Sequence, residues 1–583
     1  MAHQRRNLIL DERRHAQATA GLALANLVLA LRLEYFGLWS APAELALIYL
    51  TGLGATAASL TFHLIRLRRV LDRRGYLRSI AADLVLLVPV AVAAFSAEAF
   101  VVAVLARMTV VLSRLIAETH VGQRLIAQLY LRPARLLVIS FAVVIVGGTV
   151  LLTFPRATTD GRGAGAVDAL FTSTSATCVT GLAVLNTVSD ELANPELQSF
   201  SSFGHLVILV LIQVGGLGIM TLSGSILLLV GRRLTLRSQG VLQNILDEAS
   251  GLGMIHTIRA IVLMTVIVEG AGALALFLLL GDEVPDPGQR AWASVFHSVS
   301  AFCNAGFALW GDSLTRFRAD PGVNLVMSLL IIMGGLGFTV VGAVFTRDLL
   351  RRGGVRRMMG SLPVHARVVL HTTVLLLIAG MVGWYYLEYD RSLAGMGVPE
   401  KLLASWFQSV SLRTAGFNTV DFGAIGPVTI LLSVVLMIIG GSPGGTAGGV
   451  KTSTVALLVL SVRSMVRGDE DVDIHGRTVP RSLLSKAVTI VVIAFCTFVV
   501  VLALLLATQP HLPFDAILFE TASALGTVGL SMGVTPELTP SGKILVSLLM
   551  FVGRLGPLTL ALAVGEGATR RRVRFPEARI AVG

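Results

Sequence analysis

Long apolar runs recur along the chain and alternate with short polar segments rich in arginine. A helix needs about 20 apolar residues to cross the hydrocarbon layer, where backbone polar groups must pair internally, so these runs predict membrane-spanning helices. Four runs precede residue 120, and eight more follow in pairs. The first four cover 18–37, 44–66, 81–97 and 99–117. The pairs cover 136–154 and 203–231, 259–280 and 323–346, 368–387 and 427–463, and 486–507 and 541–566.

Each pair encloses a shorter piece that ends on a glycine. These pieces are too short to span, so they are predicted to be re-entrant pore helices. They read FTSTSATCVTGL at 171–182, FHSVSAFCNAGF at 296–307, FQSVSLRTAGF at 407–417 and FETASALGTVGL at 519–530. The second long helices share another signature: QVGGLGIMTL at 213–222, IMGGLGFTVV at 332–341, IIGGSPGGTAGGVKTST at 438–454 and FVGRLGPLTL at 551–560. Two signatures recurring in the same order indicate a fourfold internal repeat.

The predicted fold is an all-α integral membrane protein with four tandem helix–pore loop–helix repeats around one central pore, preceded by about four N-terminal transmembrane helices. The predicted division is 1–130 for the N-terminal addition, 131–245 for pore repeat 1, 246–360 for repeat 2, 361–480 for repeat 3 with an intramembrane loop, and 481–583 for repeat 4 with a basic tail. We expect the addition to serve in packing or in an oligomer interface, or to modulate a regulatory partner.

Composition and charge agree with a membrane location. The chain is 54% hydrophobic and 14% charged, and its mean hydropathy is +0.79, far above that of a soluble domain. The net charge of +12 lies in short loops between apolar spans, which favours membrane orientation over nucleic-acid binding. Arginines follow each second helix, whereas Asp282, Asp320 and Asp421 lie in the opposite loops. Twelve crossings in the cell membrane with both termini cytoplasmic are therefore expected.

The glycine-ended loops are the candidate ion site. Rings of backbone carbonyls can replace the water shell of a cation, and glycine reaches the backbone angles that turn them inward. A short helix ending there adds about half a negative charge. One such glycine is commonly a packing residue, but four aligned copies favour an ion pathway. The predicted filter tetrads contain no acid, and they are Cys178-Val179-Thr180-Gly181, Cys303-Asn304-Ala305-Gly306, Arg413-Thr414-Ala415-Gly416 and Gly526-Thr527-Val528-Gly529.

The third repeat carries an insertion that the others lack. Glycine and proline disfavour a helix interior, and broken backbone at membrane depth is tolerated only where protein buries it or water lines it. With the other three second helices expected to be unbroken, the insertion is predicted to be a gate rather than a kink. Its residues are Gly440, Gly441, Ser442, Pro443, Gly444, Gly445, Thr446, Ala447, Gly448 and Gly449.

Three basic residues lie near the same depth. Arg554 replaces the second glycine of GGLG, and we expect it to hydrogen-bond the loop and to place a positive barrier below the filter. Lys451 follows the loop; a functional role and a role in capping loop carbonyls are equally open. Arg413 is expected to point away from the axis and to pair with Asp421 or another outer acid. His297, His365 and His371 are expected to be packing or surface residues.

The four loops together with GGSPGGTAGGVKTST resemble the TrkH/KtrB/HKT superfamily of potassium transporters, over about residues 136–566. The resemblance implies uptake of a monovalent cation, with K⁺ bound at the filter tetrads. It also implies a homodimer with one pore per protomer and, in bacteria, a cytosolic nucleotide-binding regulatory subunit of the TrkA/KtrA type. In that family the inserted loop is a gate beneath the filter. Glycine at all four filter positions goes with potassium in the family, although Na⁺ as transported, coupling or activating ion stays open.

Two other function classes are disfavoured. An alternating-access secondary transporter usually has inverted repeats, whereas these repeats run in one topology. A membrane enzyme needs a nucleophile and base, a metal cluster or a phosphate-binding motif. Cys178, Cys303 and Cys496 have no metal-ligand spacing, and GGSPGGTAGGVKTST lacks the spacing of a P-loop. The sequence therefore predicts a transporter and not an enzyme.

Overall fold

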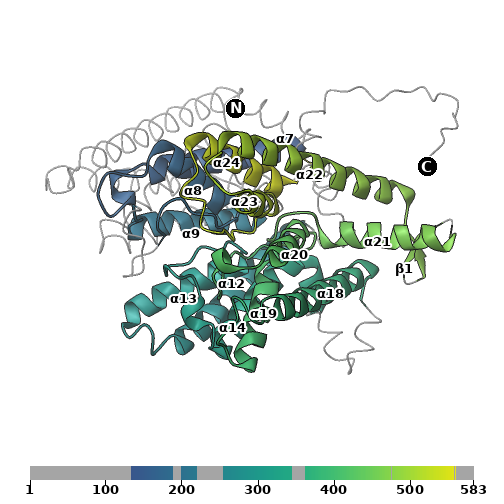
Figure 1. Cartoon of the computed structure of the whole chain (residues 1–583), viewed down its shortest axis with the longest axis horizontal. Helices are drawn as coiled ribbons and strands as arrows, with labels where there is room; N and C mark the ends of the chain where they lie inside the picture. Colours follow the sequence, from purple (N-terminus) through teal and green to yellow (C-terminus); the bar gives the residue numbers. More distant parts are fainter. Residues whose placement is uncertain are drawn as a thin grey trace, which may run out of the picture.

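The computed structural model describes residues 133–187, 198–218, 254–344, 362–469, 471–474, 476–556 and 559. The described chain is helical apart from one small hairpin (Figure 1). The helices are α7 (Pro133–Leu152), α8 (Ala166–Thr177), α9 (Ser202–Gly216), α12 (Met254–Leu279), α13 (Pro287–Phe302), α14 (Pro321–Leu336), α15 (Phe338–Val344), α18 (Val364–Leu387), α19 (Val398–Ser411), α20 (Pro427–Ile438), α21 (Thr452–Arg467), α22 (Arg481–Thr508), α23 (Phe514–Gly526) and α24 (Pro540–Leu555).

Short 3-10 turns and the hairpin complete the described elements. The turns are η3 (Pro155–Ala157), η4 (Thr315–Phe317) and η5 (Phe422–Ala424), and strands β1 (Asp473–Ile474) and β2 (Arg477–Thr478) pair antiparallel. We divide the helices into group 1 (α7 to α9), group 2 (α12 to α15), group 3 (α18 to α21) and group 4 (α22 to α24). The predicted N-terminal segment 1–130, with its four helices, lies outside the described residues. The basic tail from residue 560 onward also lies outside them.

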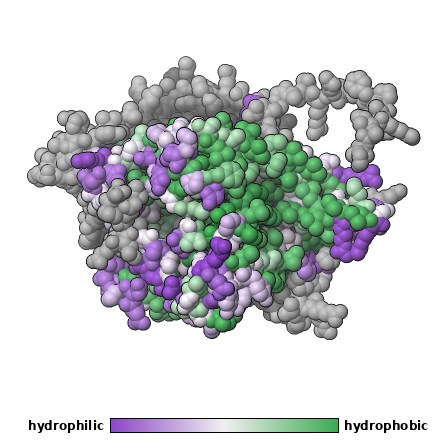
Figure 2. Space-filling model, viewed as in Figure 1, coloured by the Kyte–Doolittle hydropathy of each residue, from purple (hydrophilic) through white to green (hydrophobic). Residues whose placement is uncertain are grey.

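The first helix of each group is a membrane-spanning candidate, as predicted. Within the described residues, α7, α12, α18 and α22 are long and apolar enough to cross a bilayer, and α14 with α15 adds a bent fifth span. Many of their large apolar side chains point outward, including Val143 on α7, Leu278 on α12, Leu375 on α18 and Phe495 on α22. Figure 2 shows a broad hydrophobic surface over the helices, with hydrophilic residues gathered at its left and lower margins and again near the hairpin end on the right. Such a surface fits contact with lipid rather than water.

The short pieces between the long helices are α8, α13, α19 and α23, as predicted. Start signals are clear at α13, where the Asp286 carboxylate accepts a hydrogen bond of 2.7 Å from the Gln289 amide and Pro287 is the first helical residue. Each short helix ends within two residues of the first residue of its tetrad. Their C-terminal ends are therefore fixed next to the predicted filter residues.

The second helices differ from the prediction: the helix of group 2 is broken, and the described helices of groups 1 and 4 end at Gly216 and Leu555, just before a left-handed glycine. In group 2, α14 ends at Leu336 and α15 leaves at an angle of 109°. The intervening Gly337 has φ of 88°, and the equivalent Gly218 and Gly556 have φ of 72° and 82°. A right-handed helix cannot continue through a left-handed residue, and the last glycine of GGLG reaches that conformation without a Cβ clash. In group 3, α20 already ends at Ile438, before its two glycines, and the insertion follows.

The four groups close into a ring through their second helices. Each second helix packs against the short helix of the next group: α9 against α13, α14 against α19, α20 against α23, and α24 against α8. Figure 1 shows groups 1 and 4 in one half of the molecule and groups 2 and 3 in the other. We call each of these contacts a seam. Four seams in cyclic order place the four tetrads around one point.

Close backbone packing holds the short helix to its own second helix in groups 1, 2 and 4. A Cβ added to Gly215 would lie 1.9 Å from the Thr177 carbonyl oxygen, and one added to Gly334 would lie 1.8 Å from that of Phe302. In group 4, a Cβ on Gly553 would lie 2.2 Å from the Leu525 carbonyl oxygen. No side chain fits at these distances, which explains the first glycine of the signature in these three groups. In group 3 the equivalent Gly440 lies against the Gly448 carbonyl of the inserted loop instead.

Adjacent glycines in α14 offer a matched test of this packing. Gly334→Ala is expected to lower the free energy of unfolding by about 1–3 kcal/mol, because the new methyl group would displace the Phe302 carbonyl. Gly335→Ala is expected to change it little, because the nearest atom to its Cβ is 3.6 Å away. Thermal melting of the two purified variants in detergent measures the difference. Equal melting temperatures would contradict the close packing of α14 on α13.

Candidate functional site

The four tetrads share one backbone conformation. Their second residues are not glycine and yet are left-handed, and their last residues are glycines with positive φ. The φ values are 57° at Val179, 60° at Asn304, 72° at Thr414 and 50° at Thr527, then 98° at Gly181, 73° at Gly306, 81° at Gly416 and 94° at Gly529. A left-handed non-glycine residue costs about 1–2 kcal/mol. Strain repeated four times at one place is typical of a functional site.

The four glycines meet in a closed ring. A Cβ on Gly181 would lie 2.4 Å from the Ala305 carbonyl oxygen, in the next tetrad along the chain. The same contact recurs three times: Gly306 to Ala415 at 2.8 Å, Gly416 to Val528 at 2.5 Å, and Gly529 back to Thr180 at 2.0 Å. Each glycine thus lies against the third carbonyl of its neighbour. The structure brings all sixteen predicted tetrad residues to one place.

Serines in the short helices hold the tetrads. The Ser175 hydroxyl accepts a hydrogen bond of 3.0 Å from the Gly181 amide, and Ser523 does the same for Gly529. In the other two groups, Ser300 donates to the Phe307 carbonyl at 2.8 Å and Ser411 donates to that of Phe417. The tetrad backbone is therefore fixed by hydrogen bonds outside the ring, which leaves the ring carbonyls unused by these serines.

A cavity of about 300 Å³ lies on the glycine side of the ring. All four tetrad glycines line it, together with polar side chains from the segments that follow the tetrads, among them Asn186, Ser313, Asn418 and Thr535. Trp310 and Phe422 form part of its wall. A wide polar chamber leading to a narrow carbonyl ring allows a hydrated ion to approach before it loses water.

The inserted loop 440–449 packs against the opposite end of the tetrads. The two ends of the loop are joined by two hydrogen bonds of 3.0 Å, from the Gly440 amide to the Val450 carbonyl and from the Val450 amide to the Ile438 carbonyl. The Thr446 hydroxyl contacts the Phe302 carbonyl at 3.1 Å and the Asn304 side chain at 2.9 Å. A Cβ on Gly448 would lie 2.0 Å from the Thr527 hydroxyl. The loop therefore touches tetrads of groups 2 and 4.

Backbone pairing also joins the loop to the break in group 2. The Ser442 amide donates to the Gly335 carbonyl at 2.9 Å, and the Thr446 amide donates to that of Gly334 at 3.0 Å. The Phe338 amide donates to the Gly444 carbonyl at 3.2 Å. These partners are free because α14 ends there, so the break at Gly337 supplies the groups that hold the loop.

The three basic residues near the loop donate to carbonyl oxygens. Arg554, 7% exposed, donates to the carbonyls of Thr446 and Gly215, which confirms the expected contact with the loop. Lys451 donates to the Ala447 carbonyl at 2.7 Å, the capping alternative. Both side chains therefore reach carbonyl oxygens of the loop itself.

Arg413 corrects one prediction. It does not pair with Asp421, whose carboxylate instead accepts from the Gly423 amide at the start of η5. The Arg413 guanidinium donates to the Gly440 carbonyl at 3.1 Å and to that of Thr373 at 3.3 Å. It turns away from the glycine ring, as expected, but toward the loop rather than the outer acids. The reason is its place at the first tetrad position, the end farthest from the outer chamber.

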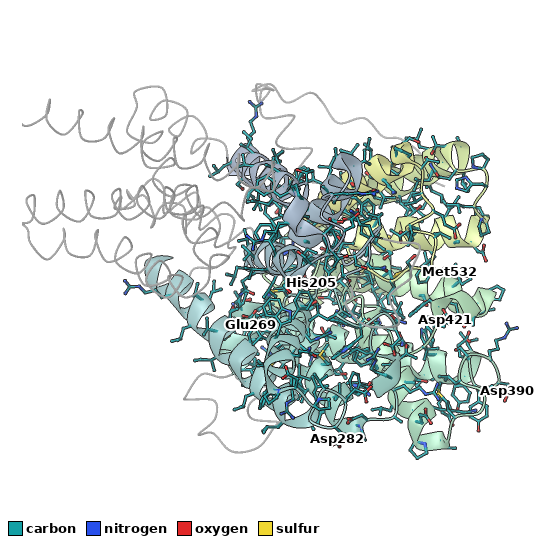
Figure 3. The ribbon with its side chains drawn as sticks, turned by 90° about the vertical axis from the view of Figure 1, so that its left-hand side faces the viewer. His205, Glu269, Asp282, Asp390, Asp421 and Met532 are labelled. Carbon is teal, nitrogen blue, oxygen red and sulfur yellow. The ribbon has the colours of Figure 1, made fainter. Side chains whose placement is uncertain are left out.

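Sequence reasoning missed Glu269. This carboxylate lies partway along α12, away from Asp282 beyond the helix end (Figure 3), and is 8% exposed. It accepts from the Gln213 side chain at 3.1 Å and lies 3.7 Å from the Cys303 thiol. An acid inside an apolar span is itself a signal of function, and that signal was present in the sequence. Glu520 on α23 was missed likewise; it accepts from the Thr535 hydroxyl at 2.6 Å.

The buried histidine in the short helices is a packing residue, as predicted. His297 contacts the Ala293 carbonyl at 2.7 Å, accepts from the Leu309 amide at 3.2 Å and stacks on Trp310 with ring centroids 4.0 Å apart. These contacts anchor the chain that returns from the tetrad of group 2.

Comparison with known proteins agrees with this architecture. The family model for TrkH, described as cation transport protein, matches residues 99–566. The chain belongs to the TrkH family. The match begins before residue 136, where the motifs placed its start, so part of the predicted N-terminal addition belongs to the family region. The helical architecture also resembles a solved structure, the potassium transporter TrkH from Vibrio parahaemolyticus, with a TM-score of 0.61 and 20% identity, covering 84% of this chain and 96% of that chain.

Two curated relatives extend the comparison. One is the Ktr system potassium uptake protein B of Bacillus subtilis, which is 38% identical over 77% of this chain and 97% of the relative. Another is the potassium/sodium uptake protein NtpJ of Enterococcus hirae, 34% identical over 78% of this chain and 98% of the relative. The TrkH family member described here therefore aligns with nearly the full length of both.

Proposed function

We propose that this protein takes up potassium across the cell membrane through the ring of tetrad carbonyls, gated by the loop 440–449. The observation that carries the proposal is the ring itself, in which each tetrad glycine lies against a carbonyl of the next tetrad. The family and the names of its potassium uptake relatives support the same function. In this proposal the four groups are pore repeats around one central axis, and the sixteen tetrad residues are the filter.

The chemistry of the ring favours a monovalent cation. The tetrads carry no carboxylate, and the C-terminal ends of four short helices add partial negative charge, about half an elementary charge each. Glycine in all four tetrads supports potassium. The second candidate is a sodium-permeable or sodium-coupled transporter of the same fold, since one relative is named a potassium/sodium uptake protein.

The loop 440–449 fits a gate because it packs against the inner end of the tetrads and is held by hydrogen bonds rather than by apolar core packing. Arg554 adds a buried positive charge at the same level, which opposes a cation in the pathway while the loop is in place. Lys451, which donates within the loop, stabilises its closed shape in this scheme. The loop must move aside for conduction.

The wider assembly is also a proposal. We infer a homodimer with one pore per protomer, both termini cytoplasmic, and a cytosolic nucleotide-binding regulatory subunit that docks on the inner face. The basis is the family resemblance together with the outward-facing apolar surface, which fits lipid and a second membrane subunit.

The proposed function predicts growth of a potassium-uptake-deficient bacterium and potassium flux into liposomes. Expression in a potassium-uptake-deficient bacterium, with and without a co-expressed regulatory subunit, is expected to restore growth at low potassium. Purified protein in liposomes is expected to carry K⁺ faster than Na⁺ under an imposed membrane potential, which supplies about 2.3 kcal/mol per charge per 100 mV. Equal or faster Na⁺ flux would select the sodium alternative. The proposal would be refuted if the protein neither restored growth at low potassium nor carried K⁺ or Na⁺ in liposomes.

A further inference from the structure

One side chain links a filter tetrad to the inserted loop. Arg413 is the first residue of the group 3 tetrad, and its guanidinium donates to the carbonyl of Gly440, the first residue of the loop. The equivalent positions in groups 1, 2 and 4 carry Cys178, Cys303 and Gly526. None of these side chains is long enough to span the same distance. The contact between a tetrad side chain and the loop is therefore specific to group 3, the group that carries the loop.

Burial makes this contact costly to lose. Arg413 is 7% exposed, and both of its hydrogen-bonded partners, the carbonyls of Gly440 and Thr373, are backbone groups. A buried guanidinium that loses a partner carries an uncompensated charge. In the closed position the loop supplies one of the two carbonyls that accept from Arg413, and displacement of Gly440 leaves the guanidinium short of that acceptor.

Arg413 and Arg554 hold the loop from opposite sides. Arg413 lies at the seam of α14 and α19, between groups 2 and 3, whereas Arg554 lies on α24 at the seam with α8, between groups 4 and 1. In the cyclic order these two seams are diagonal. Arg413 holds Gly440 at the start of the loop, and Arg554 holds Thr446 near its middle. Two donors on opposite sides fix a loop more firmly than either alone.

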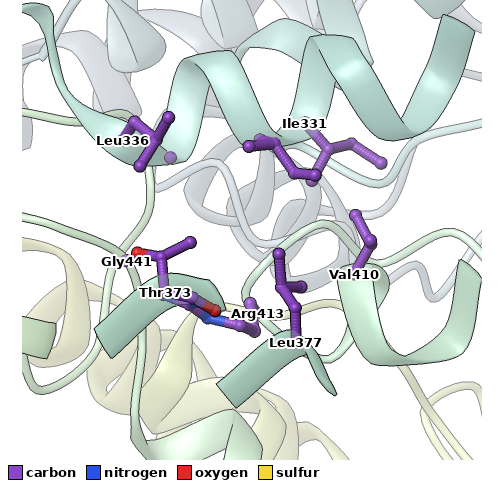
Figure 4. Close-up of a pocket in the computed structure, with 9 residues that line it drawn as sticks. Ile331, Leu336, Thr373, Leu377, Val410, Arg413 and Gly441 are labelled. Atoms are coloured by element: carbon purple, nitrogen blue, oxygen red, sulfur yellow. The ribbon is translucent and has the colours of Figure 1, made fainter. Parts of the chain in front are cut away.

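A small cavity lies beside the Arg413 side chain. Its volume is about 20 Å³, and it is bordered by the loop through Gly441 and by α14 and α18 through residues such as Ile331, Leu336 and Leu377 (Figure 4). The Arg413 Nε atom and the Thr373 hydroxyl are the polar groups here that lack a protein partner within the described residues. This space allows the guanidinium to shift as Gly440 moves, without repacking α14 on α19.

We propose that Arg413 is a positioning residue that couples the gate to the filter. Arg413 holds the loop in its closed position, as a latch. Movement of the loop releases the Arg413 side chain, and this release changes the orientation of the Arg413 and Thr414 carbonyls in the filter. This inference rests on the proposed function. Arg554 holds the same loop but belongs to no tetrad, so it acts on the gate alone. Loss of Arg413 changes both gating and selectivity, and loss of Arg554 changes gating.

Hydrogen exchange of the full-length protein in lipid nanodiscs tests the latch without any transport. Arg413→Met is expected to speed exchange of amides in peptides covering 440–450 about tenfold, the effect of losing one hydrogen bond to a charged group. Thr373→Val, which lines the same cavity but does not touch the loop through its side chain, is the matched control and is expected to leave exchange unchanged. Exchange in the hairpin at 473–478 should not change in any variant. Unchanged exchange of the loop in Arg413→Met would overturn the latch.

Arg413→Lys covers the case in which Arg413→Met fails to fold. Lysine keeps the charge but has a single head group in place of the two-armed guanidinium, so an intermediate increase in exchange is expected. Exchange equal to wild type would again overturn the latch.

Liposome flux tests the coupling. Arg413→Met is expected to raise total cation flux and to lower the K⁺-to-Na⁺ permeability ratio severalfold, whereas Arg554→Ala raises flux with the ratio unchanged. A higher flux with an unaltered ratio in Arg413→Met would refute the link to the filter. Absence of flux in the wild-type protein would refute the proposed function, while the exchange experiment still decides whether Arg413 latches the loop.

Discussion

Replacing Gly306 with serine is expected to abolish growth at low potassium and to lower K⁺ flux in liposomes by at least about tenfold. Gly306 has φ of 73°, and a Cβ there would lie 2.8 Å from both the Ala415 carbonyl oxygen and the Gly416 Cα. The left-handed conformation alone costs about 1–2 kcal/mol for a residue with a side chain, and the clash is with backbone that cannot rotate away. The neighbouring carbonyl must move, so the ring loses its geometry.

The control for this experiment is Gly147→Ser on α7. Gly147 lies in the candidate membrane span α7, and a Cβ there meets no atom of the described residues within 4 Å. The same chemical change is therefore expected to leave flux unaltered. Potassium flux in Gly306→Ser equal to that of the control, with both variants folded by size-exclusion chromatography, would mean that cations do not pass through the tetrad ring.

The repeated parts of the site were predictable from the sequence because their signal is local. A short helix that contains a serine and ends at a tetrad with glycine in last position carries its own length and turn signal, so α8, α13, α19 and α23 could be placed by pattern alone. Four copies then identified Gly181, Gly306, Gly416 and Gly529 as equivalent. Their approach in a ring follows from tandem repetition, because four like units with like seams close on themselves.

The departures from the prediction are long-range. The break at Gly337 depends on backbone partners in a loop about a hundred residues away, where the Ser442 amide meets the Gly335 carbonyl. The helix propensity of an apolar segment does not indicate that the carbonyls at its end will pair with a distant loop instead of with their own helix. Arg413 was assigned to an acid because oppositely charged side chains commonly pair, but within the described residues its guanidinium donates to the carbonyls of Thr373 and Gly440. Glu269 has no counterpart in the repeat, because the first helices of the other groups, α7, α18 and α22, carry no acid.

Loss of the Arg554 side chain is expected to have the second large effect, in the opposite direction. Arg554→Ala should raise K⁺ flux at least about tenfold, because it removes the donors to the Thr446 and Gly215 carbonyls, each hydrogen bond to a charged group being worth about 1.5–3 kcal/mol. It also removes a buried positive charge from beside the pathway. The measurement is K⁺ flux and the K⁺-to-Na⁺ permeability ratio in liposomes.

Two further variants separate the roles of charge and hydrogen bonding at Arg554. Arg554→Gln keeps a donor without the charge, and Arg554→Lys keeps the charge with a single head group. If the positive barrier dominates, glutamine raises flux as alanine does, while lysine stays near wild type; if the latch dominates, lysine also raises flux. Arg463→Ala, an exposed arginine on α21, is the control for loss of a basic residue near the loop and should change nothing. Wild-type rate and ion dependence in Arg554→Ala would mean that Arg554 does not hold the gate.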